Sequence, residues 1–361
     1  MNNMSLFDLL PEEEAAQYKP KKSTDWKWTF ADYPKEKNGL KVFSCFACGG
    51  GSTMGYKLAG CEVLGCCEID PKMNEVYIKN HNPKYNFLMD IRAFNNLPKE
   101  EIPKELLHLD ILDGSPPCTT FSMAGDREES WGKKKKFREG QAEQTLDDLS
   151  FVFIETVAKL RPRCVIMENV EGLIRGEAWD YVQRIYMQFK DIGYTVGHWL
   201  LKGQQMGVPQ KRHRVFFVAM RNDNPFAPLE LDMSFNYEPI PYGVFKTEDE
   251  KLADGKMAKA IRQRLPGEKV EDVMFRLYGV RSGITHRIVP VDDVYPTQTA
   301  GHGDIWTEDG NHPSDLDVIH AQTFPEDYDF GSAKVEYICG MSVPPVMIKR
   351  IVQRLIESGV L

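Results

Sequence analysis

The sequence predicts an α/β fold, in which a mainly parallel sheet carries helices on both faces and a separate small domain follows. Three features predict it: β-rich runs alternate with amphipathic stretches over residues 41–220, this alternation stops at 222–287, and an apolar helical stripe returns at 344–356. Such alternation is typical of parallel sheets, because each parallel connection crosses over through a helix that covers one face. A chain of 361 residues is long enough for one large core and a smaller unit.

The expected elements follow in chain order. Residues 1–40 are rich in Lys, Glu and Pro and lack periodicity, so they predict a loosely ordered extension. The first domain is expected over 41–222, the small domain over 223–295, and a return to the first domain over 296–361. The expected strands are 41–46, 62–70, 86–90, 106–113, 164–170, 194–201 and 214–220. The expected helices are 73–80, 149–160, 179–189 and 344–356.

Composition narrows the class of protein. The net charge of -8 argues against a general binder of polyanions, although basic runs at Lys133–Lys136 and 211–214 could hold a nucleic acid in a local cleft. Eight scattered cysteines do not form a disulfide framework and favour a reducing compartment. No apolar run approaches a membrane span, and residues 1–22 do not resemble a secretory signal. We therefore expect a cytoplasmic protein with no membrane partner.

A glycine-rich loop, Phe46-Ala-Cys-Gly-Gly-Gly-Ser-Thr-Met-Gly55, follows the first expected strand and opens the first helix. Glycines there let the backbone approach a ligand. Glu68, about 20 residues later, is placed to accept hydrogen bonds from a ribose, and Asp90 ends the third strand within reach of an adenine amino group. The loop is not Gly-x-Gly-x-x-Gly, so S-adenosyl-L-methionine fits better than a dinucleotide.

A cysteine stands among hydroxyls in Asp113-Gly-Ser-Pro-Pro-Cys-Thr-Thr-Phe-Ser122. The two prolines deny the backbone both helix and ladder, and strand-end loops of α/β sheets commonly hold the chemistry. Cys118 is therefore a candidate nucleophile, and the glycine-flanked lysine run after it predicts a flap that closes on an anionic substrate. Cys45 and Cys48 form a Cys-x-x-Cys pair, but a structural zinc needs two well-spaced pairs, so we expect no metal.

Two further strand ends carry polar side chains. The fifth expected strand runs from apolar residues into Glu168 and Asn169, where a buried carboxylate must be paired or protonated. Before the seventh strand, Arg212 and Arg214 lie at i, i+2 and so on one side of an extended segment. Two such guanidiniums could hold a carboxylate, a phosphate or a base carbonyl.

Taken in order, these motifs resemble those of DNA cytosine-5 methyltransferases of bacterial or phage type. The resemblance covers about residues 41–222 and 296–361 and is specific because many motifs share one order. It implies a Rossmann-like catalytic domain with an inserted target-recognition domain. The motifs that carry it are Phe46-Ala-Cys-Gly-Gly-Gly51, Glu68, Asp90, Pro116-Pro-Cys118, Glu168-Asn-Val170, Gln210-x-Arg-x-Arg214, Thr297-x-Thr-Ala300 and Gly340-Met-Ser-Val-Pro344.

The resemblance implies methyl transfer from S-adenosyl-L-methionine to C5 of a cytosine flipped out of double-stranded DNA. Cys118 would add to C6, Glu168 would bind N3 and the exocyclic amine, and Arg214 would contact O2. Arg212 would support the site and Asn169 would orient the Cys118 loop. The implied cofactor-binding residues are Phe46, Ala47, Cys48, Gly49, Gly50, Gly51, Glu68, Ile69, Asp90, Ile91, Pro117, Leu149, Ser342 and Val343. The implied DNA-binding residues are Ser122, Lys133, Lys134, Lys135, Lys136, Thr297, Thr299, Arg281 and Arg287.

The inserted region adds candidate donors for reading base edges in the major groove. They are Lys246, Lys256, Lys259, Arg262, Arg264 and Arg276. Three residues depart from the pattern of this family. Cys48 replaces the first glycine of the cofactor loop, Thr119 replaces a glutamine after the nucleophile, and Met341 replaces an asparagine in the late motif.

Other functions remain open at this point. A tRNA cytosine-5 methyltransferase would use the same chemistry, a non-catalytic DNA-binding protein could keep the same fold, and a nicotinamide-linked oxidoreductase would need a dinucleotide. A cognate restriction endonuclease is a possible partner of the methyltransferase. Met4-Ser-Leu-Phe-Asp-Leu-Leu10 resembles peptides by which bacterial replication proteins dock on the sliding clamp, although it could instead cover the protein's own surface.

Overall fold

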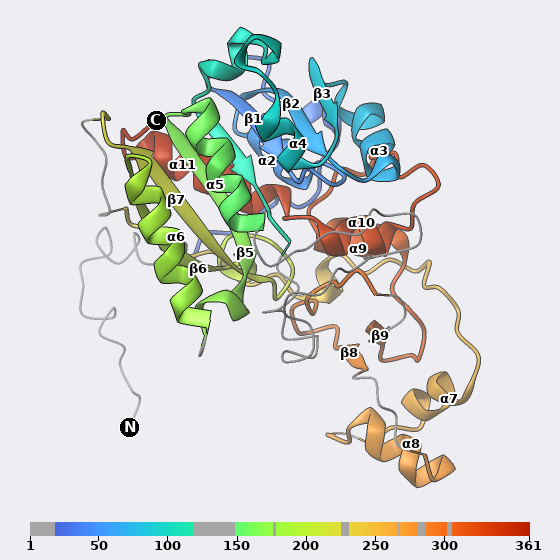
Figure 1. Ribbon diagram of the computed structural model, residues 1–361. Helices are drawn as coiled ribbons and strands as arrows, with labels where there is room; N and C mark the ends of the chain where they lie inside the picture. The colour runs from blue at the N-terminus through green and yellow to red at the C-terminus, as the bar shows by residue number, and fades with distance from the viewer. Residues whose placement is uncertain are drawn as a thin grey trace.

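The centre of the molecule is a seven-stranded sheet with the order β3-β2-β1-β4-β5-β7-β6 (Figure 1). The computed structural model describes residues 19–117, 149–175, 178–224, 231–265, 267–280, 286–301 and 305–361. All neighbouring strands pair in parallel except β7, which is antiparallel to β5 and to β6. The strands are β1 (Lys41–Cys45), β2 (Glu62–Glu68), β3 (Tyr85–Leu88), β4 (Ile111–Gly114), β5 (Cys164–Val170), β6 (Tyr194–Lys202) and β7 (His213–Arg221).

Helices cover both faces of this sheet, which confirms the predicted fold class (Figure 1). One face packs against α4 (Ile91–Asn96), α5 (Leu149–Leu160) and α6 (Trp179–Asp191) in a single apolar cluster. The other face packs against α2 (Gly51–Leu58) and α11 (Pro345–Glu357) in a second cluster. Parallel strands buried on both faces need apolar side chains in both directions, which explains their continuous apolar runs.

Two strand-end carboxylates also start the helices that follow them. Asp70 accepts hydrogen bonds from the amides of Lys72 (2.9 Å) and Met73 (3.3 Å) at the start of α3 (Pro71–His81). Asp90 accepts one from the amide of Arg92 (2.8 Å) at the start of α4. Such caps satisfy amides that have no partner inside the helix. The same acidic residues that line the sheet edge therefore also end the strand-to-helix turns.

The strand expected at 106–113 is wrong in its first half. Only β4 is a strand there, and Lys104–Leu107 form a 3-10 helix after Pro103. Leu106 and Leu109 are nonetheless buried. An apolar run can be buried from a turn as well as from a strand, and apolar content alone does not distinguish the two.

Residues 19–40 are packed against the rest of the chain, so the expected loose order is wrong for them. The Trp28 side chain is buried, and its Nε1 donates to the carbonyl of Thr323 at 2.9 Å. Trp26 contacts the rings of His320 and Phe245, with centroids 5.1 and 5.7 Å away. Four aromatic residues in this charged segment, Trp26, Trp28, Phe30 and Tyr33, supply enough apolar area to anchor it. Residues 1–18, including the Met4–Leu10 peptide, lie outside the described residues.

The small domain is built around a two-stranded parallel sheet of β8 (Arg287–Val289) and β9 (Ile305–Thr307). This pairing joins residues on both sides of the expected boundary at 295. Figure 1 shows α7 (Lys256–Arg262) and α8 (Val270–Tyr278) at the far end of this part, away from the central sheet. α9 (Asp315–Ala321) and α10 (Val335–Met341) lie between the two parts.

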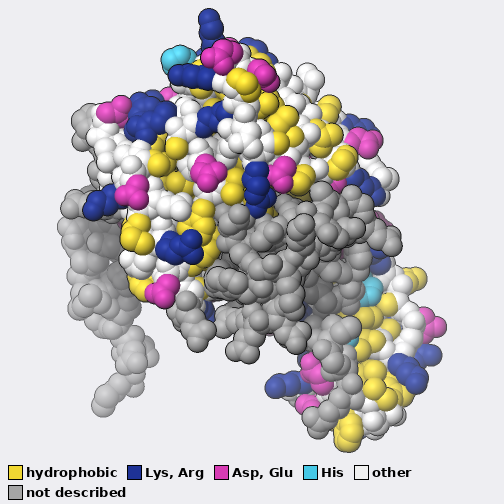
Figure 2. All heavy atoms as spheres, in the orientation of Figure 1, with side chains coloured by type: hydrophobic (Ala, Val, Ile, Leu, Met, Phe, Trp, Pro, Cys, Tyr) yellow, Lys and Arg dark blue, Asp and Glu magenta, His cyan; other side chains and the backbone are white. Residues whose placement is uncertain are grey.

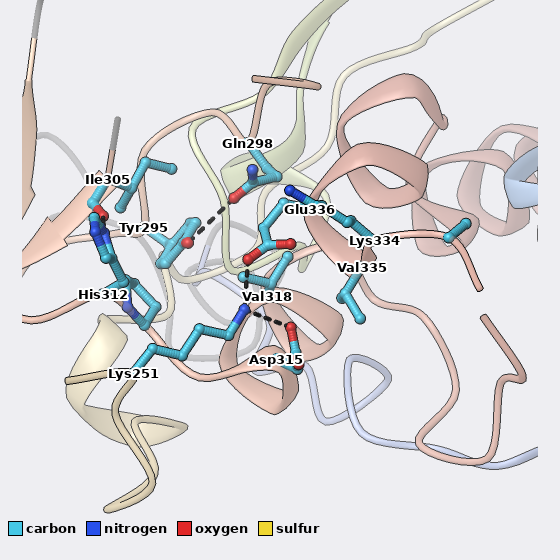
Figure 3. Close-up of a pocket in the computed structure, with 12 residues that line it drawn as sticks. Lys251, Tyr295, Gln298, Ile305, His312, Asp315, Val318, Lys334, Val335 and Glu336 are labelled. Carbon is cyan, nitrogen blue, oxygen red and sulfur yellow. Dashed lines mark hydrogen bonds and ion pairs between the residues drawn. The ribbon is translucent and has the colours of Figure 1, made fainter. Parts of the chain in front are cut away.

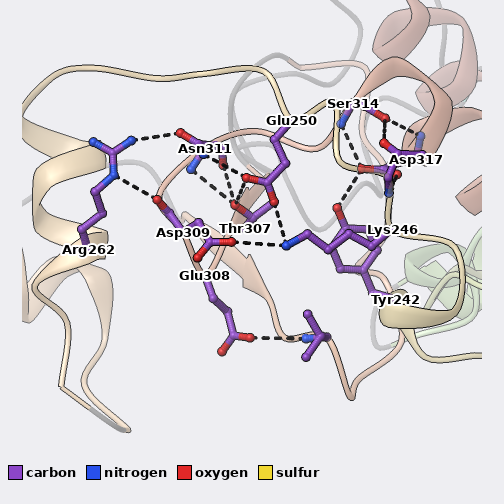
Figure 4. Close-up of polar contacts among 12 residues, drawn as sticks. Tyr242, Lys246, Glu250, Arg262, Thr307, Glu308, Asp309, Asn311, Ser314 and Asp317 are labelled. Atoms are coloured by element: carbon purple, nitrogen blue, oxygen red, sulfur yellow. Dashed lines mark hydrogen bonds and ion pairs between the residues drawn. The ribbon is translucent and has the colours of Figure 1, made fainter.

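Polar contacts hold the loops of the small domain together (Figure 4). Asp317 is fully buried and accepts hydrogen bonds from the Tyr242 hydroxyl and the Thr247 amide, both at 2.8 Å. Glu250 pairs with Lys246 at 2.9 Å and accepts from the side-chain amide of Asn311 at the same distance. A buried carboxylate is stable only with such partners. These contacts tie the loop at 242–251 to the chain at 305–317.

One face of the molecule carries mixed charge. On the face shown in Figure 2, Lys and Arg side chains alternate with Asp and Glu over the coloured residues. This agrees with the modest net charge of -8. Within the described ranges, no helix has both the length and the apolar character that crossing a membrane requires.

Candidate active site

An arginine and a glutamate meet where β5 ends and β7 begins. The antiparallel register pairs Val170 of β5 with Arg214 of β7. Arg214 Nε donates to Glu168 Oε1 at 2.8 Å, and their side chains are only 16% and 12% exposed. Burial lowers the pKa of Arg214, and the charge of Glu168 opposes that shift. The reversal of β7 is therefore what brings these two predicted catalytic residues together.

The pair keeps atoms that can bind a ligand. Arg214 Nη1 donates to the carbonyl of His213 at 2.8 Å. Among the described residues, Glu168 Oε2 and Arg214 Nη2 have no hydrogen-bond partner. A carboxylate oxygen and a guanidinium nitrogen side by side can engage an acceptor and a donor of one planar heterocycle.

Asn169 holds the chain that leads to the predicted nucleophile. Its side chain is buried, its Nδ2 donates to the carbonyl of Pro116 at 3.2 Å, and its Oδ1 accepts from the amide of Val170 at 2.9 Å. Cys118 lies outside the described residues, and Pro117 is the last described residue before it. The contact of Asn169 with the Pro116 carbonyl agrees with its predicted role of orienting the Cys118 loop, for the part of that loop that the structure describes.

Asp113, at the end of β4, is a buried acid that the sequence did not assign a role. It accepts from the Ser44 hydroxyl at 2.6 Å and from the Tyr56 hydroxyl at 3.0 Å. Burial raises the pKa of Asp113 to about 7, and the charge of Glu168 acts in the same direction. A carboxylate at the end of an apolar run was the signal that could have identified it, as it did for Glu168.

Arg212 joins three chain segments and forms no ion pair among the described residues, although the charge of Glu168 acts on it. Its Nη1 donates to the carbonyl of Gln298 at 3.0 Å and its Nη2 to the carbonyl of Gly340 at 3.1 Å. Its Nε is buried without a partner among the described residues. Burial lowers the pKa of Arg212, and the neighbouring Arg214 adds to that effect. The two arginines thus have separate partners, although they are only two residues apart.

Glu68 binds the glycine-rich loop directly. Its Oε2 accepts from the amide of Cys48 at 2.7 Å, and its Oε1 accepts from the amides of Ile69 and Asp70, both at 2.9 Å. Burial raises the pKa of Glu68, while these amides oppose the shift. Phe46 and Cys48 have positive φ angles of 56° and 47°. The loop is therefore held in a conformation that side-chain-bearing residues rarely adopt.

The predicted cofactor segments lie against each other. A Cβ on Gly51 would meet the Val343 carbonyl at 2.4 Å and the Ser342 Cβ at 2.8 Å. Ser342 is buried, and its Oγ has no partner within the described chain. An orphan buried hydroxyl beside a glycine loop fits a polar ligand, because leaving it unpaired costs free energy. The donor and acceptor groups present therefore suit S-adenosyl-L-methionine.

The remaining predicted cofactor residues differ in accessibility. Leu88, which precedes Met89 and Asp90, pairs with Glu68 in the sheet, so Asp90 and Ile69 follow the ends of neighbouring strands. Ile91 and Leu149, in contrast, are buried in the apolar cluster on one sheet face. Their side chains pack inside the protein.

The predicted DNA-binding residues that the structure describes are engaged within the chain. Thr297 Oγ1 donates to the carbonyl of Lys211, and Arg287 Nη1 donates to the carbonyl of Thr297. A Cβ on Gly340 would meet the Thr299 carbonyl carbon at 2.2 Å, so this segment lies directly on α10. The other predicted DNA contacts and the Thr119 departure lie outside the described residues: Ser122, Lys133, Lys134, Lys135, Lys136 and Arg281.

Two of the candidate base-reading residues, Arg262 and Arg276, are bonded within the chain. Arg262 donates to the carbonyls of Asp309 (2.9 Å) and Ala253 (2.8 Å) and to Asn311 Oδ1 (2.9 Å), as Figure 4 shows in part. Arg276 forms a bidentate pair with Glu268 at 2.9 Å. Donors occupied in this way cannot also read base edges without breaking these contacts.

A cavity of about 490 Å³ lies beside this site, on the small-domain side of Gln298 (Figure 3). Its charged Lys251 pairs with Asp315 at 2.6 Å and with Glu336 at 2.5 Å. Gln298 belongs to its lining and also accepts from Arg212 through its carbonyl. None of the residues predicted to be catalytic lines it. Within the described part of the chain, no three His, Cys, Asp or Glu side chains are grouped as metal ligands.

Comparison with known proteins gives one family. A family model described as C-5 cytosine-specific DNA methylase matches residues 40–279. Type II methyltransferase M.FnuDI of Fusobacterium nucleatum is 31% identical over 215 residues, which cover 60% of this chain and 54% of that protein. Type II methyltransferase M.Sau96I of Staphylococcus aureus is 27% identical over 348 residues, covering 90% and 77%.

The alignments with M.FnuDI and with M.HindV of Haemophilus influenzae each span about half the length of the relative, 54% in both cases. A crystal structure of a Spodoptera frugiperda DNMT2 mutant matches with a TM-score of 0.62 at 17% identity, covering 88% of this chain and 100% of that one. At this identity the likeness concerns the fold.

Proposed function

Because the chain belongs to the C-5 cytosine-specific DNA methylase family, we propose that it methylates C5 of a flipped-out cytosine in a short sequence of double-stranded DNA. The observation that carries the proposal is the buried Arg214–Glu168 pair. It stands beside Asn169, which holds the chain two residues before Cys118. A base-binding pair and a nucleophile segment thus share one edge of the sheet.

The chemistry starts from a poor nucleophile. C5 of cytosine reacts slowly by itself, and addition of the Cys118 thiolate to C6 makes C5 enamine-like. Glu168 would bind N3 and the exocyclic amine, and Arg214 would bind O2, so both stabilise charge that develops as sulfur adds. S-adenosyl-L-methionine supplies an electrophilic methyl group when bound. Loss of the C5 proton to a solvent base then restores the C5–C6 double bond and releases the cysteine sulfur.

The chain offers a matching set of groups for that cofactor. Among the described residues, one carboxylate oxygen of Glu68 accepts from the Cys48 amide alone, so it can still accept from a ribose. Ser342 offers its orphan hydroxyl, and Asp90 offers an acceptor at the next strand end. Cys48 and Met341 depart from the family pattern here, and Met341 is 39% exposed at the end of α10.

The target base must leave the stacked duplex, which costs a few kcal/mol that protein–DNA contacts offset. The proposed phosphate contacts come from Ser122, the lysine run at 133–136, Thr297 and Thr299. The side chains of Thr297 and Arg287 are already hydrogen-bonded to backbone carbonyls of this chain. They would therefore position the segment around Thr297 for DNA, and its backbone groups as well as its side chains would make the contacts. Arg281 remains a candidate for base reading.

We also propose partners and a location. Relatives named Type II methyltransferases support a cognate restriction endonuclease, and the cytoplasm supplies both DNA and cofactor. The Met4–Leu10 peptide would dock on a sliding clamp. Deleting residues 1–10 and measuring clamp binding tests the last point, and unchanged binding would exclude it.

The experiment that tests the function compares acceptors. Purified protein with tritiated cofactor should label duplex DNA and leave tRNA unlabelled, and bisulfite sequencing of DNA from an expressing host should reveal one short modified sequence. Cys118→Ala should abolish transfer. Labelling of tRNA instead of DNA, or full activity of that variant, would overturn the proposal.

A further inference from the structure

We propose that Tyr328 is a positioning residue of the cofactor loop, because its hydroxyl and His81 together hold the Gly49 carbonyl. Tyr328 donates to the Gly49 oxygen at 2.5 Å, and His81 Nε2 lies 3.1 Å from the same oxygen. Both side chains are buried, with 5% exposure each. The inference rests on the proposed function, since the loop in question is the proposed cofactor site.

The glycines of this loop make room for these two side chains. A Cβ on Gly49 would lie 2.7 Å from the Tyr328 hydroxyl, and a Cβ on Gly50 would lie 2.1 Å from His81 Nε2. Real Cβ atoms do not approach so closely. Packing inside the protein therefore requires glycine at positions 49 and 50. The contacts of Tyr328 and His81 with the Gly49 carbonyl set the orientation of the peptide plane between the two glycines.

The His81 ring is fixed in one state. The carbonyl oxygen accepts only, so Nε2 must carry the proton, and the buried Nδ1 then has no partner in the described chain. Burial lowers the pKa of His81 to about 3, with the charge of Lys57 acting in the same direction. Tyr77 and Tyr328 flank the ring, with centroids 4.6 and 6.2 Å away. The second donor is therefore present throughout the physiological pH range.

Cys48 is the residue that this arrangement controls. It has a positive φ angle and stands between two fixed points, its own amide on Glu68 and the Gly49 carbonyl on Tyr328 and His81. A non-glycine residue stays in this region only where its surroundings hold it. Loss of the Tyr328 hydroxyl should relax the loop and, through the Cys48–Glu68 bond, displace the carboxylate proposed to bind ribose.

A pair of Tyr→Phe substitutions tests this directly. Tyr328→Phe removes the donor to Gly49, whereas Tyr33→Phe removes a buried hydroxyl of the same aromatic cluster that has no partner among the described residues. We expect Tyr328→Phe to weaken binding of S-adenosylhomocysteine about tenfold in calorimetry, the effect of one buried hydrogen bond. Tyr33→Phe should stay within about twofold of wild type.

A second readout needs no ligand. Without cofactor, amide hydrogen exchange over residues 46–55 should be faster in Tyr328→Phe than in Tyr33→Phe. His81→Gln, whose side-chain amide can replace the Nε2 donor, should bind the ligand nearly as wild type, and His81→Leu should weaken it. These measurements use the folded fraction and so stay informative if one variant loses stability.

The outcomes are distinguishable. Equal affinity and equal exchange in the two Tyr→Phe variants would overturn the role of Tyr328, with the proposed function intact. Failure of the wild-type protein to bind S-adenosylhomocysteine would instead contradict the proposed function itself.

Discussion

An arginine at the edge of the central sheet and one in the small domain differ in burial and in their hydrogen-bond partners. At the sheet edge, Arg212 is buried and, among the described residues, forms no ion pair and leaves its Nε without a partner. In the small domain, Arg262 is more exposed and donates to four acceptors of its own chain. Buried groups with incomplete partners cost stability and are retained where a ligand completes them. Arg212 and Arg262 therefore differ both in burial and in partnering, and of the two it is Arg212 that keeps a buried nitrogen without a partner among the described residues.

The largest effect is expected for the acid that pairs with Arg214 at the candidate site, compared with an acid that pairs with an arginine in the small domain. Glu168→Gln removes the charge that pairs with Arg214 and should lower the single-turnover rate of methyl transfer by roughly 10³-fold, within the range for a positioned acid–base group. Glu268→Gln, which breaks the pair with Arg276 in the small domain, is the matched control and should change the rate less than about threefold. Equal losses in both variants would contradict the distinction.

A stability measurement sharpens the same comparison. Arg212→Met leaves the carbonyls of Gln298 and Gly340 without donors in a buried place and should reduce the free energy of unfolding by about 3 kcal/mol. Arg262→Met opens contacts near the surface and should cost about 1 kcal/mol. Urea denaturation of both variants measures the difference in the free energy of unfolding. A larger loss for Arg262→Met than for Arg212→Met would show that Arg262 contributes more to stability.

The raised pKa of Asp113 predicts a pH dependence of the free energy of unfolding. Its folded pKa of about 7 lies above the ordinary value of 3.8, so the unfolded state ionises first as pH rises. The stability that protonated Asp113 contributes is complete below pH 3.8 and is lost as pH rises to 7. Asp113→Asn removes this dependence, so the variant should gain about 2 kcal/mol relative to wild type between pH 5 and pH 7. Parallel pH slopes for the two proteins would refute the assignment.

The smallest expected effect concerns backbone strain. Cys48 has a φ angle of 47°, which glycine adopts at lower cost, so Cys48→Gly should stabilise the protein by about 0.5 kcal/mol, net of lost side-chain contacts. Thr323 has a similar φ of 56°, but its Oγ1 accepts from the Val346 amide at 3.3 Å. Thr323→Gly should therefore be destabilising, and thermal unfolding of the two variants should shift in opposite directions.

The fold class followed from local patterns. Alternating apolar runs at periods of two and about 3.6 residues depend on neighbours along the chain, and they placed strands such as β5 and helices such as α6 closely. The strand expected from residue 106 was wrong because apolar content does not distinguish a buried turn from a strand. The packing of residues 19–40 was missed because its partners, such as Thr323, lie far away in sequence.

By itself, the sequence predicted most strands of the central sheet and the motifs proposed for the candidate site, because these motifs are local: the glycine loop, Glu168 and Arg214 each sit at a recognisable strand end. The tertiary structure decided which of these groups meet. The reversed strand β7 set the Arg214–Glu168 pair, and Tyr328 reached Gly49 from 279 residues away. Such contacts depend on the register and packing of elements distant in the chain, which no local pattern encodes.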